Sequence, residues 1–264
     1  MRLLRIPVRY YYVDSDEETW RIESKFHYIE KEITINPREA ALILVDIWRE
    51  GFNSFSRRAA EITVRKIVPV IDAARKAGIA IVHAPSPRIA INYLKGRKLT
   101  EPSSGSLYKP QRQKWPPEDF VKREGKYSQY SRKIRRDPKY FQRLLGGSYD
   151  IAESVKPLKD DFIVVDGNDL QQLLLKKKIL HLFYAGFYVN MCVLYRDYGI
   201  KAMADRGYNI ILLRDCTTAI ETHDTVNDLL ITKLTIRHIE TLFGFSTSSE
   251  EFLRACSDSF KVSS

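Results

Sequence analysis

Cys192 is the residue of this chain best placed to act as a nucleophile. It follows an apolar, strand-like stretch over residues 179–186 that ends at a glycine, and it falls in the first turn of the helix expected next. A thiol near a helix N-terminus lies close to unpaired backbone N–H groups, which favour its thiolate form and can stabilise an oxyanion. The competing interpretation is that a single cysteine in an apolar stretch is a small buried hydrophobic residue.

Asp46 is the first candidate partner for this thiol. The apolar run that begins at Ala40 stops at Asp46, and a loop-like sequence follows. A buried parallel strand would carry this carboxylate to the edge of the sheet where ligands bind. There it would accept the thiol proton and later pass it to a leaving amine. The alternative role for Asp46 is a helix cap or a loop carboxylate.

Two further polar residues end neighbouring strands. Asp166 ends the third expected strand, and His83 lies near the end of the second. Because the carboxyl ends of parallel strands meet at one edge of a sheet, we expect both residues to converge with Asp46 and Cys192. A single histidine at a strand end is also often a structural residue held by a partner. Trp48 either walls the pocket or packs as an ordinary aromatic.

Alternating strands and helices must position these residues. This alternation predicts right-handed βαβ units and a three-layer, doubly wound parallel α/β sheet of Rossmann-like type. Pro69 should kink or divide the first helix and Gly78 should end it. The expected strands cover residues 40–48, 79–84, 161–166, 179–186 and 208–215, with a short strand near 238–244. The expected helices cover 56–77, 168–178, 192–206 and 225–237, followed by a C-terminal helix capped by Ser and Thr before acids.

The chain is predicted to hold one domain over residues 38–264, preceded by a polar, aromatic-rich N-terminal arm over residues 1–37. Residues 86–150 interrupt the alternation and form a long basic insertion, which is too long for an ordinary connection. Between residues 94 and 143 there are fifteen Lys and Arg against five Asp and Glu, so this segment carries the whole net charge of +10.

Composition narrows the classes of protein. Three cysteines without a CxxC or a clustered Cys/His pattern predict neither zinc nor a disulfide framework, so we expect no metal, no cofactor and a reducing, cytoplasmic setting. The N-terminus has no continuous apolar stretch of signal-peptide length. Because no stretch approaches about 20 apolar residues, we expect no membrane association.

Three short motifs carry a resemblance to a known family. VDIW after the first strand, HAPS after the second and AGFYVNMCVLYRDYGIKAM around Cys192 resemble the isochorismatase-like cysteine hydrolase superfamily, over residues 38–90 and 160–245. The resemblance implies that Cys192 is the nucleophile and Asp46 the general acid and base in cleaving a C–N bond through a thioester. It also implies a cis peptide between Tyr188 and Val189 and an oxyanion hole of backbone N–H groups. The residues expected to contact substrate are Trp48, His83, Tyr188, Val189, Asn190 and Arg196.

The chain departs from this family where a triad lysine is expected. After the third strand it reads Asp166 and Gly167. A carboxylate there would raise the pKa of both Asp46 and Cys192, whereas a lysine would lower them. We include Asp166 among the catalytic residues because of its position. Lys95, Arg97 or Arg196 would then have to supply the missing cation.

The sequence therefore predicts a hydrolase that acts on a small amide, ureide or carbamoyl compound, and the resemblance implies a homo-oligomer. One alternative is a catalytically degenerate relative that lost activity with the lysine. Another is a nucleic-acid-binding module, because segment 94–143 interleaves its cations with aromatic residues suited to phosphate contact and base stacking. The less specific interpretation of that segment is a solvated lid or an oligomer contact, and we favour it over nucleic-acid binding.

Overall fold

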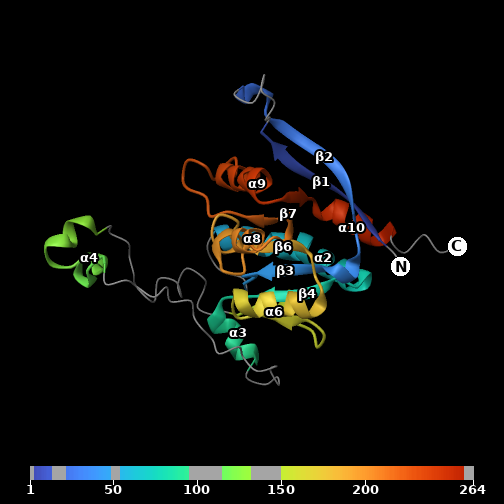
Figure 1. The fold of residues 1–264 in the computed structure, drawn as a ribbon, viewed down its shortest axis with the longest axis horizontal. Coiled ribbons are helices and arrows are strands. Elements are labelled where there is room, and N and C mark those ends of the chain that lie inside the picture. The colour runs from blue at the N-terminus through green and yellow to red at the C-terminus, as the bar shows by residue number, and fades with distance from the viewer. Residues whose placement is uncertain (1–2, 14–21, 49–53, 95–114, 132–149, 259–264) are drawn as a thin grey trace.

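The computed structural model describes residues 3–13, 22–48, 54–94, 115–131 and 150–258. In this part of the chain one eight-stranded sheet runs in the order β2-β1-β8-β7-β6-β3-β4-β5 (Figure 1). The strands from β3 to β8 pair in parallel, as the alternation of elements predicted. Their bounds are β1 Leu4–Tyr12, β2 His27–Ile35, β3 Ala40–Val45, β4 Ala80–Ala84, β5 Phe162–Ile163, β6 His181–Phe187, β7 Asn209–Thr218 and β8 Phe245–Thr247.

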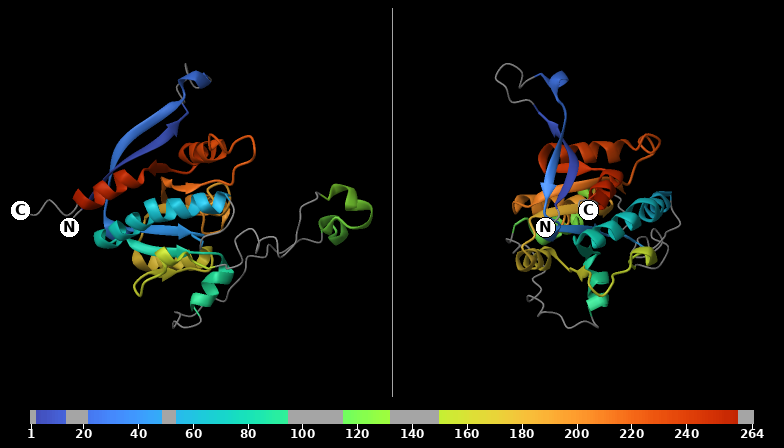
Figure 2. Two further views of the ribbon diagram at one scale, coloured as in Figure 1. Left: turned by 180° about the vertical axis from the view of Figure 1, so that it is seen from behind. Right: turned by 90° about the vertical axis from the view of Figure 1, so that its right-hand side faces the viewer.

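Helices cover both faces of the sheet (Figure 2), which makes the predicted three layers. Along β3, Leu42 and Leu44 belong to one buried apolar cluster and Ile43 and Val45 to the other, as the two-residue period of a strand requires. The first cluster includes residues of α1 (Ser54–Ile62), α2 (Val68–Ala77), α3 (Pro87–Leu94) and α10 (Ser249–Asp258). The second includes residues of α6 (Gly167–Lys177), α7 (Cys192–Tyr195), α8 (Ile200–Asp205) and α9 (Leu230–Leu242).

The first long helix is divided, as predicted from Pro69. A π-helical stretch, Thr63–Ile67, separates α1 from α2, and Pro69 stands in the first turn of α2. Proline has no backbone N–H to donate, so this position avoids the loss of an internal hydrogen bond. Gly78 then ends α2 with a φ of 83°, and its N–H donates to the carbonyls of Ala74 and Arg75.

The helix expected over residues 192–206 is instead two short helices, α7 and α8. The backbone leaves the helical conformation at Arg196. Residues between the two helices form hydrogen bonds with other elements instead. The Asp197 carboxylate accepts from the N–H of Gly167 at 2.8 Å, and the Tyr184 hydroxyl donates to the carbonyl of Tyr198 at 2.8 Å. The apolar pattern of residues 192–206 did not reveal this break because it depends on these distant partners.

The expected N-terminal arm is part of the sheet. β1 and β2 form an antiparallel pair, and β1 also pairs with β8 in an antiparallel manner, with Arg9 opposite Ser246. The sheet is therefore mixed rather than wholly parallel. Leu4, Ile6 and Val8 are buried in the first apolar cluster, so the start of this hairpin contributes to the core.

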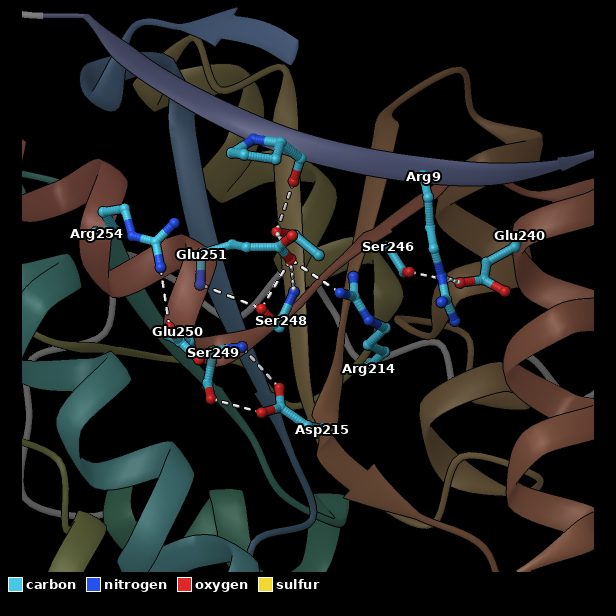
Figure 3. A network of polar contacts seen from close by, with 12 residues as sticks. Arg9, Arg214, Asp215, Glu240, Ser246, Ser248, Ser249, Glu250, Glu251 and Arg254 are labelled. Carbon is cyan, nitrogen blue, oxygen red and sulfur yellow. Dashed lines mark hydrogen bonds and ion pairs between the residues drawn. The ribbon is translucent and has the colours of Figure 1, made fainter. Parts of the chain in front are cut away.

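Polar contacts fasten β1, β8 and α10 together (Figure 3). The Ser248 N–H donates to the Glu251 carboxylate at 2.7 Å, and the Glu251 N–H donates back to Ser248 Oγ at 3.2 Å. This reciprocal pair is a capping box, and it confirms the predicted N-cap of the C-terminal helix. Arg214 also contacts Glu251, and the Thr247 hydroxyl donates to the carbonyl of Pro7 on β1.

Of the basic insertion, residues 87–94 form α3, and residues 115–131 form a small unit that we describe by itself. There α4 (Glu118–Lys122) precedes a 3-10 turn, Gly125–Tyr130. Phe120 contacts the edge of Tyr127 with centroids 5.1 Å apart, and the Arg123 guanidinium lies 4.2 Å from the Phe120 ring. Lys95 and Arg97 lie outside the described residues. No helix that the structure describes is long and apolar enough to cross a membrane.

Candidate functional site

Asp46 lies where β3 ends, at the carboxyl edge of the sheet. Its backbone has a φ of 46°, in the left-handed region, and its N–H donates to the carbonyl of Ala84 on β4 at 3.3 Å. The side chain is fully buried. A positive φ in a non-glycine residue marks a backbone held by its surroundings, and such positions cluster at functional sites. The strand end therefore holds this buried carboxylate at the carboxyl edge of the sheet.

Cys192 reaches the same place from β6. The turn between β6 and α7 is closed by the carbonyl of Tyr188, which accepts from the N–H groups of Met191 at 2.9 Å and Val193 at 3.3 Å. A cis peptide is present in this turn, but it joins Phe187 to Tyr188, one residue earlier than predicted. Val189 instead donates its N–H to the carbonyl of Thr218, next to the pairing of β6 with β7.

The Cys192 thiol and the Asp46 carboxyl lie close enough that each shifts the pKa of the other. Burial is the larger cause for both. It raises the pKa of Asp46 to about 6, against lowering contributions from Cys192, Arg196 and Ser86. Burial and the Asp46 charge raise the pKa of Cys192 to about 12. At neutral pH the pair is therefore an ionised carboxylate beside a neutral thiol.

This result corrects the expectation that the helix N-terminus keeps Cys192 as a thiolate. The helix that begins at Cys192 has only four residues, and its dipole does not offset burial and a neighbouring carboxylate. The resting thiol is therefore protonated, and the Asp46 carboxylate beside it is a group able to accept that proton.

Arg196 supplies the cation of this site. One of its terminal nitrogens lies 3.7 Å from Asp46 Oδ2, and its charge lowers the pKa of both Asp46 and Cys192. It follows Tyr195 at the end of α7, so a single helical turn separates it from the thiol. Of the three cations considered from the sequence, it is the one within the described residues, and it contacts the pair.

Ser86 is a member of the site that the sequence did not single out. Its hydroxyl lies 3.3 Å from Asp46 Oδ1 and 3.1 Å from a terminal nitrogen of Arg196, so it joins the acid to the cation. Ser86 is the last letter of the HAPS motif, but nothing in that motif indicates a contact with residues 40 and 110 positions away in the chain.

The side chains of Asp166 and His83 form contacts that the sequence did not predict. Asp166 is the N-cap of α6, and its carboxylate accepts from the N–H groups of Asn168 and Asp169, both at 2.9 Å. His83 is buried, with Nε2 3.2 Å from the Asp161 carboxylate, which also pairs with Arg75 at 2.6 Å. Asp166 caps because it directly precedes a helix, and His83 is held by a buried acid. Both contacts are structural, and a catalytic or substrate-binding role for these residues stays a prediction from the sequence.

Trp48 and Asn190 also have structural contacts. Trp48 packs against the first apolar cluster, and its backbone forms an isolated bridge with Ile151, the residue after the basic insertion. The Asn190 side chain accepts from the N–H of Ile220 at 3.2 Å and donates to its carbonyl at 3.4 Å. It thereby fastens the turn before Cys192 to the chain that follows β7.

Tyr188 and Val189 belong to the turn that leads from β6 to the thiol. Tyr188 contacts the edge of Phe55, with centroids 5.5 Å apart, and Val189 is fully buried in the second apolar cluster. Burial raises the pKa of the Tyr188 phenol well above its usual range, and the Cys192 charge contributes to that rise. Tyr188 therefore presents a neutral hydroxyl-bearing ring near the sulfur.

The thiol is half-buried, and exposed side chains stand on both sides of it in sequence. Met191 and Tyr195 are 44% and 66% exposed, so solvent reaches this end of the sheet. As the first residue of α7, Cys192 has a backbone N–H without an acceptor inside its own helix. Among the described residues no group of three or more His, Cys, Asp or Glu side chains is arranged to hold a metal ion.

Comparison with known proteins shows what this chain is similar to. Residues 146–241 match the family model named Isochorismatase domain. A cysteine hydrolase from Pseudomonas syringae pv. phaseolicola 1448A superposes with a TM-score of 0.56 at 19% identity, covering 86% of this chain and 96% of that one. The resemblance noted in the sequence is confirmed over residues 146–241, and the chain shares the fold of that solved cysteine hydrolase.

Two further solved structures were found at lower similarity. An isochorismatase from Pseudomonas putida KT2440 is 17% identical, with a TM-score of 0.48 and coverage of 81% of this chain and 90% of that chain. N-carbamoylsarcosine amidase from Thermoplasma acidophilum is 15% identical, with a TM-score of 0.44 and coverage of 80% and 97%. No curated protein sequence matches the chain.

Proposed function

We propose that this chain is a cysteine hydrolase that cleaves a C–N bond of a small amide, ureide or carbamoyl compound through a thioester on Cys192. One observation carries the proposal, namely that the Cys192 thiol, the buried Asp46 carboxyl and the Arg196 cation come together at the ends of paired strands. A neutral thiol next to an ionised carboxylate is an arrangement for proton transfer coupled to nucleophilic attack.

The reaction proceeds in two halves. In the first, the Cys192 S–H bond breaks, its proton moves to Asp46, and the sulfur bonds to the carbonyl carbon of the substrate. The tetrahedral intermediate then collapses as Asp46 returns the proton to the amine nitrogen and the C–N bond breaks. In the second half Asp46 takes a proton from water, and the water oxygen bonds to the thioester carbon. The C–S bond then breaks, Asp46 returns the proton to the sulfur, and the acid product is released.

Arg196 has a distinct role in this scheme. When the thiol proton has moved to Asp46, the sulfur carries the negative charge, and the Arg196 charge favours that form. Its contribution replaces that of a lysine after the third strand, where this chain has the N-cap Asp166. The guanidinium cannot lose its proton, so it stabilises charge without acting as an acid or base itself.

Ammonia release across a panel of primary amides, ureides and carbamoyl compounds tests the proposal. Wild-type protein should release ammonia from at least one member, and Cys192→Ala and Cys192→Ser should both lower kcat by a factor of at least about 1,000, because removing a nucleophile removes the covalent route. Arg196→Met should lower kcat more than Arg196→Lys. Wild-type turnover in the alanine variant would reject the mechanism.

The same panel separates the hydrolase from a degenerate relative. If Arg196 does not compensate for the missing lysine, the wild-type protein and Cys192→Ala will both leave every compound intact. A small-molecule substrate is the partner that this function implies. Assembly into a homo-oligomer stays a prediction from the resemblance.

A further inference from the structure

Ser86 occupies a helix cap position but directs its hydroxyl elsewhere. It directly precedes α3, and its carbonyl accepts from the N–H groups of Ile89 at 2.8 Å and Ala90 at 3.1 Å. A serine in this position ordinarily turns its hydroxyl back to a free N–H of its own helix. Here the hydroxyl contacts Asp46 and Arg196 instead, so it belongs to the candidate site and does not cap α3.

The chemistry of the three groups fixes the direction of these hydrogen bonds. A guanidinium has only donors, so Ser86 Oγ accepts from Arg196 at 3.1 Å. The single hydroxyl proton of Ser86 is then free to point at Asp46 Oδ1, 3.3 Å away. Oδ1 is therefore already an acceptor in the resting site. Oδ2 is buried and has no hydrogen bond of good geometry to another described group, although Arg196 lies 3.7 Å away.

We propose that Ser86 is a positioning residue that keeps Asp46 Oδ1 as a hydrogen-bond acceptor and so directs the proton of the reaction to Oδ2. The inference rests on the proposed function of this site. The Cys192 S–H bond breaks, the proton bonds to Oδ2, and the sulfur electron pair forms the C–S bond. The O–H bond at Oδ2 then breaks as the amine nitrogen is protonated and leaves. Ser86 keeps its own proton throughout.

Groups from three segments face Asp46 and determine its titration. Cys192 and Arg196 approach from α7 and its end, and Ser86 approaches from the start of α3 with both its hydroxyl and its backbone N–H. Tyr198 follows α7, and its hydroxyl donates to the carbonyl of Pro85 at 3.1 Å. Burial raises the Tyr198 pKa above its usual range, so this ring stays neutral. Loss of the Ser86 hydroxyl should therefore make Asp46 harder to ionise.

The experiment follows the pH dependence of two rates in Ser86→Ala and Ser86→Thr. The first is alkylation of Cys192 by iodoacetamide, quantified on the Cys192 peptide by mass spectrometry, because Cys216 and Cys256 are buried. The second is ammonia release. Ser248→Ala, which removes a capping hydroxyl from α10, is the matched control.

In wild-type protein the alkylation rate should rise with pH through an inflection near the Asp46 pKa of about 6. Ser86→Ala should move this inflection up by about one pH unit, as expected for losing a hydrogen bond to a charged group. Ser86→Thr should restore it. For ammonia release, kcat should fall about tenfold in Ser86→Ala with KM within about threefold, because the variant perturbs proton transfer and not ground-state binding.

The proposal is overturned if the wild-type profile has no such inflection, if Ser86→Ala leaves it in place, if threonine does not restore it, or if Ser248→Ala moves it equally. Alkylation does not require turnover. A shifted inflection without ammonia release would therefore contradict the hydrolase proposal while supporting the link between Ser86 and Asp46. An unshifted inflection in Ser86→Ala, together with ammonia release, would contradict the link between Ser86 and Asp46 while supporting the hydrolase proposal.

Discussion

At the scale of single residues, the site combines a neutral thiol, a buried carboxylate and a guanidinium. The sequence placed Asp46 and Cys192 at neighbouring strand ends, and parallel strands bring such ends together. The thiol's protonation state could not be predicted, because it depends on burial and on the Asp46 charge. Ser86 was missed for a similar reason, since its partners lie far away in the chain.

Substitution of Asp46 should change how the free energy of unfolding depends on pH. The folded-state pKa of about 6 lies above the ordinary 3.8, so ionising this carboxyl costs more in the folded than in the unfolded chain. Wild-type protein therefore loses stability from this group as pH rises from about 4 to about 6. The free energy of unfolding of Asp46→Asn should gain roughly 2 kcal/mol relative to wild type between pH 4 and 7.

Denaturant unfolding of wild-type protein and Asp46→Asn at several pH values measures the difference between their free energies of unfolding. Contributions from Asp161 and other acids that keep their surroundings cancel between the two proteins. A difference that stays constant with pH would show that Asp46 has an ordinary pKa, and the described proton transfer would lose its basis.

At the scale of elements, the approach of β3 to β6 sets the distance between acid and thiol. Gly186 pairs with Val45, the residue before Asp46, and has a φ of 125°. A Cβ at this glycine would collide with the backbone of Val45. The sequence predicted both strands, but it placed a turn at this glycine, which instead lies within β6. It did not predict that α7 ends at Tyr195, because the break depends on Asp197 meeting the start of α6.

Gly186→Ala should therefore separate β3 from β6 at the site. We expect a loss of at least about 3 kcal/mol in the free energy of unfolding, from a strained φ together with a backbone collision. Gly207→Ala is the control, because its φ of 88° is also positive but open space surrounds the position of its Cβ. It should cost only about 1 kcal/mol. Equal losses in the two variants, measured by denaturant unfolding, would exclude close packing as the reason for Gly186.

At the scale of the whole molecule, the N-terminal hairpin extends the α/β sheet. The sequence predicted the doubly wound core because its apolar runs alternate with helical segments. It did not reveal that β1 and β2 extend the sheet, because β1 meets β8 from more than 200 residues away. Arg9 lies 2.8 Å from the buried Glu240 of α9, and Ser246 also donates to this carboxylate. This contact links the two ends of the chain.

The outer strand β2 shows how the hairpin ends the sheet. Glu30, Lys31 and Glu32 are exposed on it and alternate in sign. Charged side chains on an edge strand oppose pairing with another sheet. The hairpin therefore both extends the sheet and protects its edge.

Arg9→Met should destabilise the protein by about 3 kcal/mol, because it leaves the Glu240 carboxylate buried without its cation. Arg9→Met with Glu240→Gln should recover part of that loss. The control is Arg254→Met, which breaks an exposed pair with Glu250 and should change stability by less than about 1 kcal/mol. Denaturant unfolding measures all three. A loss in Arg9→Met no larger than the control would contradict an essential role for the contact.

The most direct measurement of the central claim is mass spectrometry of the Cys192 peptide from enzyme that is quenched in acid during turnover of an amide. Covalent catalysis by this thiol predicts a mass increase equal to the acyl part of the substrate, on this peptide and not on those with Cys216 or Cys256. Turnover with an unmodified Cys192 peptide at every quench time, or the same added mass in Cys192→Ala, would contradict it.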